Sequence, residues 1–136
     1  MVDTLEPSRR SWLMSRVTAK DTKPEMVVRR IAHALGLRFR LYKGDLPGRP
    51  DLVFPKHRLA VFVHGCFWHR HEGCRLASTP KTHVEFWQAK FDANVARDKS
   101  ATAQLTAAGW NVLVLWECET RDAARTEMAL LHAIHR

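Results

Sequence analysis

The sequence predicts a single α/β domain with a mixed central sheet flanked by helices. Three short apolar segments follow one another within residues 37–64, and a fourth, residues 110–117, lies beyond a long helical segment. Strands joined by tight turns pair antiparallel, whereas strands joined through a helix usually pair parallel. The length of 136 residues is that of one domain with its own core.

The N-terminal part of the chain predicts an arm followed by a capped helix. Residues 8–18 (SRRSWLMSRVT) are typical of a cationic helix that is separate from the core, so we expect an arm at 1–20 and one domain at 21–136. The following segment, TKPEMVVRRIAHALG, opens with Thr22 and Glu25 at capping-box spacing and repeats apolar residues at helical period.

The remaining elements follow from apolar patterns and turn residues. The segments LRFRLY, DLVF and HRLAVFVH predict three consecutive strands, with KGDLPGRP and PK as the turns between them. A second capping box, Thr82 to Glu85, predicts a long helix that ends at Gly109. WNVLVLWE then predicts a buried strand, and residues 121–135 predict a final amphipathic helix.

Charge and composition indicate a folded protein with a polyanionic partner. The net charge is +8, yet 46% of the residues are hydrophobic, so this is no basic tail. No apolar run approaches the roughly 20 residues of a membrane span, and the N-terminus lacks the apolar segment of a signal peptide. We therefore expect a cytoplasmic protein that associates with nucleic acid and not with a membrane. The three cysteines cannot all pair with one another, which agrees with reduced thiols available as metal ligands.

Polar residues at two strand ends predict a hydrolytic site. Asp51 begins one predicted strand and His64 ends the next, so a hairpin brings both to one cleft. An aspartate there suits Mg²⁺, and His64 and His69 can transfer protons or contact a phosphate. Taken alone, Asp51 is better explained as a turn residue and His64 as an ordinary strand-end histidine. Their joint placement favours phosphodiester hydrolysis.

Softer ligands in the same loop indicate a second metal. His71 and Cys74 have His-x-x-Cys spacing, and Asp98 and Cys118 could complete a tetrahedral zinc site. Spacing alone leaves this open, because structural zinc more usually takes only cysteine and histidine. We interpret Cys66 as a small buried hydrophobic residue.

Four motifs resemble one enzyme family. LPGRPD, FVHGCFWHRH, EFWQAKFDANVARD and GWNVLVLWEC, in this order, resemble the very-short-patch repair endonucleases (Vsr), which nick DNA 5′ to the thymine of a T·G mismatch. The resemblance extends from about residue 8 to about residue 120. It implies a restriction-endonuclease-like fold, with a structural zinc site, in which a histidine-rich loop replaces the usual carboxylate and lysine.

The resemblance implies roles for five residues of the hydrolytic site. Asp51 matches the Mg²⁺-ligating aspartate, and the main-chain carbonyl of Val63 matches a second ligand. His64 and His69 match the catalytic pair. Glu25 matches an acidic residue that reaches the site from the first core helix, although its capping position explains it equally well.

The resemblance also implies the zinc ligands and a DNA interface. It matches His71, Cys74, Asp98 and Cys118 to the structural zinc site. Phe67, Trp68 and Trp87 match rings inserted beside the mismatch, Met14 on the arm matches a minor-groove wedge, and Lys90 and Asn94 match readers of the mismatched pair.

Ordinary explanations for these residues remain beside the implied ones. Aromatic side chains usually pack in a core, and lysine and asparagine suit a solvated helix face. Five further basic residues suit contacts with the DNA backbone: Arg9, Arg10, Arg16, Lys20 and Arg49.

The implied function is Mg²⁺-dependent, strand-specific nicking of double-stranded DNA at T·G mismatches that arise when 5-methylcytosine deaminates. A functional link to a cytosine-5 DNA methyltransferase follows, as do links to downstream mismatch-repair or polymerase factors, and we expect a monomer. Two alternatives remain: a homing or restriction-like nuclease of the same fold, and a non-catalytic zinc-stabilised DNA-binding module.

Overall fold

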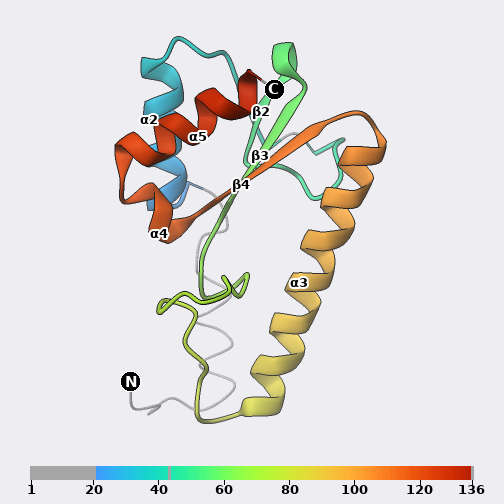
Figure 1. Cartoon of the computed structure of the whole chain (residues 1–136). Helices are drawn as coiled ribbons and strands as arrows, with labels where there is room; N and C mark the ends of the chain where they lie inside the picture. Colours follow the sequence, from blue (N-terminus) through green and yellow to red (C-terminus); the bar gives the residue numbers. More distant parts are fainter. Residues whose placement is uncertain (1–20, 43, 136) are drawn as a thin grey trace.

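The computed structural model describes residues 21–42 and 44–135. The predicted arm at 1–20, with Met14 and four of the basic residues, lies outside the described residues. In chain order the elements are α2 (Lys23–Ala34), β1 (Arg40–Leu41), β2 (Leu52–Phe54), the 3-10 helix η1 (Pro55–His57), β3 (Leu59–His64), α3 (Val84–Ala107), β4 (Asn111–Trp116), α4 (Glu117–Thr120) and α5 (Ala123–Ile134) (Figure 1).

The sheet is mixed, as the sequence predicted. Its strand order is β1-β2-β3-β4, in which the β1–β2 and β2–β3 pairs are antiparallel and the β3–β4 pair is parallel. The hairpin pairs Leu52 with Val61, and the parallel ladder pairs Val61 with Leu113. The antiparallel hairpin brings the start of β2 to the end of β3, where polar side chains gather.

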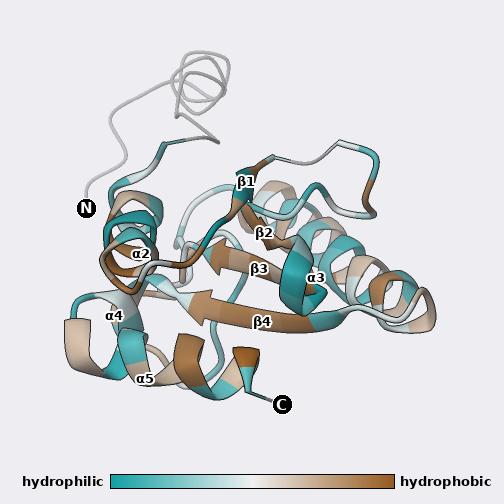
Figure 2. Cartoon of the chain, turned by 90° about the horizontal axis from the view of Figure 1, so that it is seen from above, coloured by the Kyte–Doolittle hydropathy of each residue, from teal (hydrophilic) through white to brown (hydrophobic). Residues whose placement is uncertain are grey.

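Helices cover both faces of this sheet, with α3 opposite α2 and α5 (Figure 2). Successive residues of a strand point to opposite faces. Val61 and Val63 accordingly pack toward α2 and α5, whereas Ala60 and Phe62 pack toward α3. His64 is next in this alternation and therefore faces α3.

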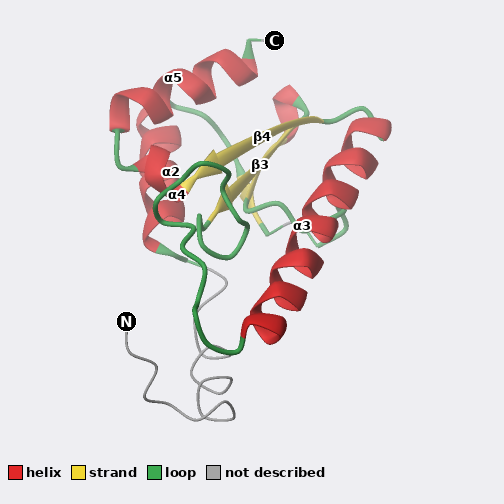
Figure 3. Cartoon of the chain, turned by 60° about the horizontal axis from the view of Figure 1, so that its bottom comes forward, coloured by secondary structure: helices red, strands yellow, loops and turns green. Residues whose placement is uncertain are grey.

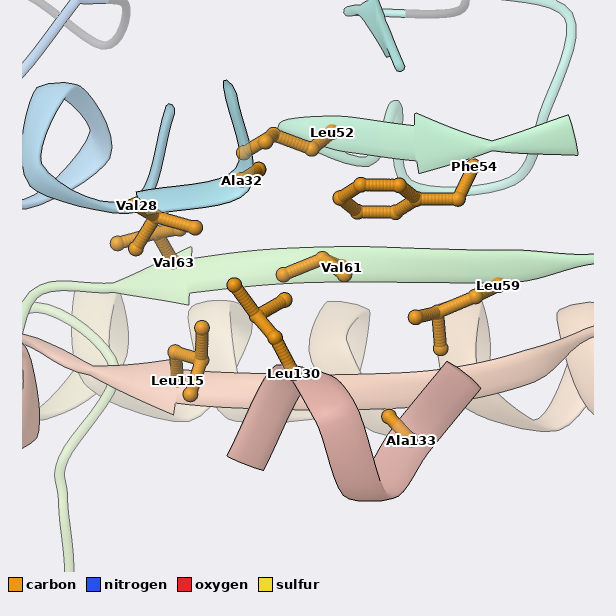
Figure 4. Close-up of a cluster of buried hydrophobic side chains, with 10 residues drawn as sticks. All are labelled: Val28, Ala32, Leu52, Phe54, Leu59, Val61, Val63, Leu115, Leu130 and Ala133. Carbon is orange, nitrogen blue, oxygen red and sulfur yellow. The ribbon is translucent and has the colours of Figure 1, made fainter. Parts of the chain in front are cut away.

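The larger core lies between the sheet and helices α2 and α5. Ten buried side chains form it (Figure 4): Val28, Ala32, Leu52, Phe54, Leu59, Val61, Val63, Leu115, Leu130 and Ala133. Burying each such side chain stabilises the fold by roughly 1.5–3 kcal/mol before conformational entropy is counted. The core thus gives the ends of β2 and β3 a rigid support.

The helix boundaries confirm one predicted cap and correct another. Thr22 caps α2 and accepts the N–H of Glu25 at 3.4 Å. The predicted capping box from Thr82 to Glu85 is wrong, because α3 begins after His83, which is left-handed (φ +54°) and provides no side-chain cap. The short helix α4, directly after β4, was not predicted.

A long loop, residues 65–83, connects β3 to α3 and carries most of the predicted site residues. Figure 3 shows this loop, in green, running from the end of β3 to the start of α3. It contains turns but neither helix nor strand. No helix in the described part of the chain has the length and apolar character needed to span a membrane.

Candidate active site and metal centre

Two carboxyl groups meet at the start of β2. Asp51 precedes the strand, and its Oδ2 accepts the N–H of Val63 at 2.6 Å. Glu25, on the first turn of α2, is only 2% exposed. Burial and the charge and hydrogen bond of Glu25 raise the pKa of Asp51 to about 7, although the bond from Val63 opposes this shift. Two adjacent buried carboxyl groups favour a cation between them.

Val63 contributes a further oxygen at the same edge. In a hydrogen-bonded strand pair, the N–H and C=O of one residue point to the same side. The carbonyl of Val63 therefore points to the edge where its N–H meets Asp51. Carboxylate and carbonyl oxygens are the ligands that Mg²⁺ prefers, so the predicted donor set fits this ion.

Two histidines stack beside the acidic pair. The rings of His64 and His69 lie 3.9 Å apart between centroids and 4° from parallel. His69 Nδ1 is 2.7 Å from one oxygen of Asp98, and His64 Nε2 is 3.9 Å from the other. Burial, together with the charge of His69, lowers the pKa of His64 to about 4. His64 is therefore neutral at neutral pH.

The structure places Asp98 apart from the other three predicted zinc ligands. Asp98 was expected beside His71, Cys74 and Cys118, but the described geometry places its carboxylate against the two stacked histidines. The reason is the path of α3, which brings Asp98 alongside the histidine that ends β3. Asp98 belongs with the histidine pair.

Three cysteines and one histidine form a separate cluster. Ligand atoms of Cys66, His71, Cys74 and Cys118 all lie within 4.8 Å of one another. His71 Nδ1 is 3.6 Å from the sulfur of Cys66 and 3.4 Å from that of Cys118. Tetrahedral zinc with ordinary bond lengths separates sulfur and nitrogen ligands by about 3.5 Å. The four residues therefore fit zinc.

Cys66 is the residue that the sequence interpretation missed. It is buried, as expected, but its sulfur faces the cluster. Cys66, His71 and Cys74 have Cys-x₄-His-x₂-Cys spacing within one loop, and this spacing could have identified it. Burial also raises the pKa of its thiol to about 12.

Aromatic side chains pack between the loop and the first turns of α3. The ring of Phe67 makes edge contacts with Trp68, Trp87 and Phe91, at centroid distances of 5.2, 5.7 and 5.2 Å. Phe67 and Trp68 are half-buried, whereas Trp87 is only 2% exposed. Trp87 thus lies inside the cluster, away from the surface position that base insertion requires.

The exposed ring at this end of the molecule belongs to Phe86. Its side chain is 47% exposed, and the ammonium group of Lys90 lies 5.8 Å from its ring centroid. Lys90 is itself exposed, so the predicted DNA contact is accessible.

Two polar residues hold in place the part of the 65–83 loop that carries Phe67 and Trp68, which we call the aromatic loop. Asn94 donates from Nδ2 to the carbonyl of Trp68 at 3.0 Å, so this predicted base reader is engaged with the loop. Arg70 donates to the carbonyl oxygens of Phe67, Ala77 and Ser78. Its guanidinium carbon lies 4.0 Å from the ring centroid of Phe91.

Comparison with known proteins assigns the family. The model of the DNA mismatch endonuclease Vsr family matches residues 2–75. The chain belongs to the Vsr family. It is 51% identical to the Type II nicking enzyme V.XorIIP of Xanthomonas oryzae, over 96% of this chain and 95% of that protein. It is 40% identical to the DNA mismatch endonuclease Vsr of Escherichia coli, over 96% and 83% of the respective chains.

Membership of the Vsr family confirms that the chain is an endonuclease. The matched residues 2–75 include the acidic pair, both stacked histidines and three members of the cysteine–histidine cluster. Asp98 and Cys118 lie beyond that match and are supplied by α3 and by the start of α4. The two clusters of this Vsr chain therefore combine residues from within and beyond the matched region.

Proposed function

We propose that this chain nicks one DNA strand 5′ to the thymine of a T·G mismatch, in a Mg²⁺-dependent reaction. One observation carries the proposal: in a Vsr-family chain, one end of the β2–β3 hairpin brings Asp51 and Glu25 beside a stacked histidine pair. The charge of His69 acts on Asp51, which indicates that acids and histidines form one site.

Asp51 and the carbonyl of Val63 would hold the magnesium ion, with Glu25 nearby. The bound ion would polarise the scissile phosphate and stabilise charge on the leaving oxygen. Burial of Asp51 beside Glu25 supports this assignment, because a cation relieves the repulsion that raises the pKa of Asp51.

His69 is the proton acceptor that the geometry favours. When His69 donates a hydrogen bond from its Nδ1–H to the carboxylate of Asp98, its Nε2 atom is left free to take a proton from the attacking water. The same carboxylate stabilises the imidazolium that results. His64, neutral and stacked on His69, would orient this ring.

Mismatch selection would come from the aromatic loop. Unstacking a base step costs a few kcal/mol, and a T·G wobble lowers that cost. Phe67 and Trp68 are half-buried and contact Trp87, and the neighbouring Phe86 is exposed beside Lys90, so a wedge and a cation would come from the same region. Asn94 supports the wedge through Trp68, and Trp87 would have to leave its cluster to insert.

Zinc bound by Cys66, His71, Cys74 and Cys118 would fix this loop.

The mismatch assignment further implies a functional link to a cytosine-5 DNA methyltransferase and to downstream repair factors. The proposal also retains Met14 as a minor-groove wedge.

A nicking assay on matched duplexes tests the function. We expect one strand of a T·G duplex to be cut with Mg²⁺ present, with no cutting after Mg²⁺ is chelated and far less cutting of the fully paired duplex. Equal cutting of both duplexes would instead indicate a restriction-like or homing nuclease. Full activity of Asp51→Asn would contradict the proposed metal site.

The role of Asp98 is tested in the same assay. Asp98→Asn should lower the nicking rate about ten- to hundredfold, because His69 loses the carboxylate that orients it, while DNA affinity stays unchanged. Asp92→Asn is the matched control, since Asp92 lies exposed on the same helix, where it accepts a hydrogen bond from Gln88. Equal rates for the two variants would exclude this role.

A further inference from the structure

The carboxylate of Glu25 accepts hydrogen bonds from three donors, and all three reach the same oxygen, Oε2. The hydroxyl of Tyr42 lies 2.5 Å away, the N–H of Asp21 lies 2.9 Å away, and Nη2 of Arg29 lies 3.4 Å away. A buried carboxylate needs such donors to replace its lost water. Three of them on one oxygen also fix the direction of the group.

Tyr42 contacts both members of the acidic pair. Its hydroxyl donates to Glu25, and its backbone N–H points to the carbonyl oxygen of Asp51 at 3.5 Å. The residue adopts a left-handed conformation, φ +46°, which is unfavourable for a side chain other than glycine. The surrounding contacts therefore hold Tyr42 in a conformation that links Glu25 to Asp51.

Arg29 lies one turn after Glu25 on α2 and contacts Tyr42. It donates to the Tyr42 hydroxyl at 2.5 Å and to Asp21 Oδ1 at 2.7 Å. Its guanidinium carbon lies 5.5 Å from the centre of the Tyr42 ring, and its side chain is 13% exposed. Arg29 thus places a positive charge behind Glu25 and fixes the ring that bonds it.

Helix capping explains only part of this network. Thr22 already caps α2, and a capping box would place the Glu25 side chain on the N–H of Thr22. The side chain instead bonds the N–H of Asp21 and the hydroxyl of Tyr42, which comes from beyond the helix. The bonds from Tyr42 and Arg29 are therefore extra to the cap, and they aim Glu25 at Asp51.

We propose that Tyr42 and Arg29 are positioning residues, which hold the Glu25 carboxylate beside Asp51 in the geometry that metal binding and nicking require. The inference rests on the proposed function of the acidic pair. Neither residue touches the reacting atoms, so their effect is exerted through Glu25.

Tyr42→Phe is the first test, because it removes only the hydroxyl. We expect kcat for nicking a T·G duplex to fall about tenfold or more, with the KM for DNA within about twofold of the original. Calorimetry should also show weaker Mn²⁺ binding to the metal site. Arg29→Gln should behave alike, Arg29→Lys should recover part of the loss, and Arg30→Gln, an exposed neighbour on α2, should change nothing.

A second test needs no activity. Tyr42 is the single tyrosine of the chain, so the ultraviolet absorbance of tyrosinate reports this residue alone. Burial and the bond to Glu25 raise the pKa of Tyr42. Glu25→Gln removes the charged acceptor and should make Tyr42 ionise at lower pH, whereas Asp92→Asn should leave its ionisation unchanged.

These outcomes separate the inference from the function beneath it. Unchanged tyrosine ionisation in Glu25→Gln, or an unchanged kcat in Tyr42→Phe, would overturn the positioning role. If Asp51→Asn were inactive at the same time, the proposed nuclease site would still be supported. An Asp51→Asn variant that nicks normally would overturn the proposed function itself.

Discussion

The carboxyl group of Asp51 is electrostatically unfavourable in its charged form. The group is desolvated and lies beside Glu25, and both effects raise its pKa to about 7. The bond from Val63 offsets only part of this cost. Function-related groups often reduce stability in this way, because they are arranged for a ligand and not for the free protein.

We therefore predict that Asp51→Asn stabilises the Mg²⁺-free protein in a pH-dependent manner. The folded-state pKa lies above the ordinary value, so folding favours the protonated form, and the contribution of Asp51 to stability is lost as pH rises through about 7. Asparagine cannot ionise. The melting temperature should rise near pH 8, by roughly 4 °C for each kcal/mol recovered, and change little near pH 4.

Thermal unfolding followed by circular dichroism checks this prediction. Asp92→Asn is the control, because an exposed aspartate on α3 should show no such dependence on pH. An identical change in melting temperature near pH 4 and near pH 8 would contradict the buried, charge-coupled state of Asp51.

At the residue scale, the sequence predicted neighbours along the chain better than neighbours in space. The sequence predicted that a hairpin brings the start of β2 to the end of β3, and Asp51 indeed accepts a hydrogen bond from Val63, the residue before His64. The sequence grouped Asp98 with the zinc ligands and left Cys66 out of them, whereas the structure places Asp98 against the histidines and Cys66 in the cysteine–histidine cluster. The rotation of α3 decides whether Asp98 faces the cysteines or the histidines, and no spacing pattern encodes that rotation.

At the scale of elements, the mixed sheet and its helix cover followed from the sequence, whereas the element boundaries did not. The strand order and the pairing of β3 with β4 are those expected from a hairpin followed by a helical crossover. The first strand is only two residues long, Arg40–Leu41, and both are exposed. An exposed edge strand buries no apolar face, so its pattern says little about its length.

The loop before Asp51 is held by close packing at Gly48. Gly48 has φ +74°, and a Cβ built there would lie 2.6 Å from Cβ of Ala101 and 3.2 Å from the ring of Phe62. Glycine therefore allows this loop to approach α3 and the sheet. The approach determines where the chain enters β2, and thus where Asp51 lies.

We predict that Gly48→Ala is more destabilising than Gly36→Ala. Both glycines have similar positive φ, +74° and +75°, but a Cβ at Gly36 meets nothing within 4 Å. Gly36→Ala should cost about 1 kcal/mol of unfolding free energy from backbone strain alone, and Gly48→Ala a further 1–3 kcal/mol or so from overpacking. Urea unfolding measures both. Equal losses would show that the loop does not pack on α3 as described.

At the scale of the whole molecule, the cysteine–histidine cluster links the loop after β3 to the adjoining ends of β3 and β4. Cys66 follows β3, His71 and Cys74 lie in the loop, and Cys118 lies in α4 after β4. The ring of Trp116 stacks on His71 at 4.2 Å and meets His64 edge-on at 5.2 Å. A metal in the cluster would therefore fix the aromatic loop and the catalytic histidines relative to one another.

The last prediction separates the two candidate sets of zinc ligands. Cys66→Ser should lose the roughly one zinc per chain that elemental analysis is expected to find, and its melting temperature should fall, because a structural metal contributes directly to folding free energy. Asp98→Asn should keep its zinc and lose nicking activity. If Asp98→Asn lost zinc while Cys66→Ser kept it, the ligands would be those expected from the sequence. If only Cys66→Ser loses zinc, the same variant can be tested for its discrimination between T·G and paired DNA. Reduced discrimination would show that the metal fixes the aromatic wedge relative to the catalytic site.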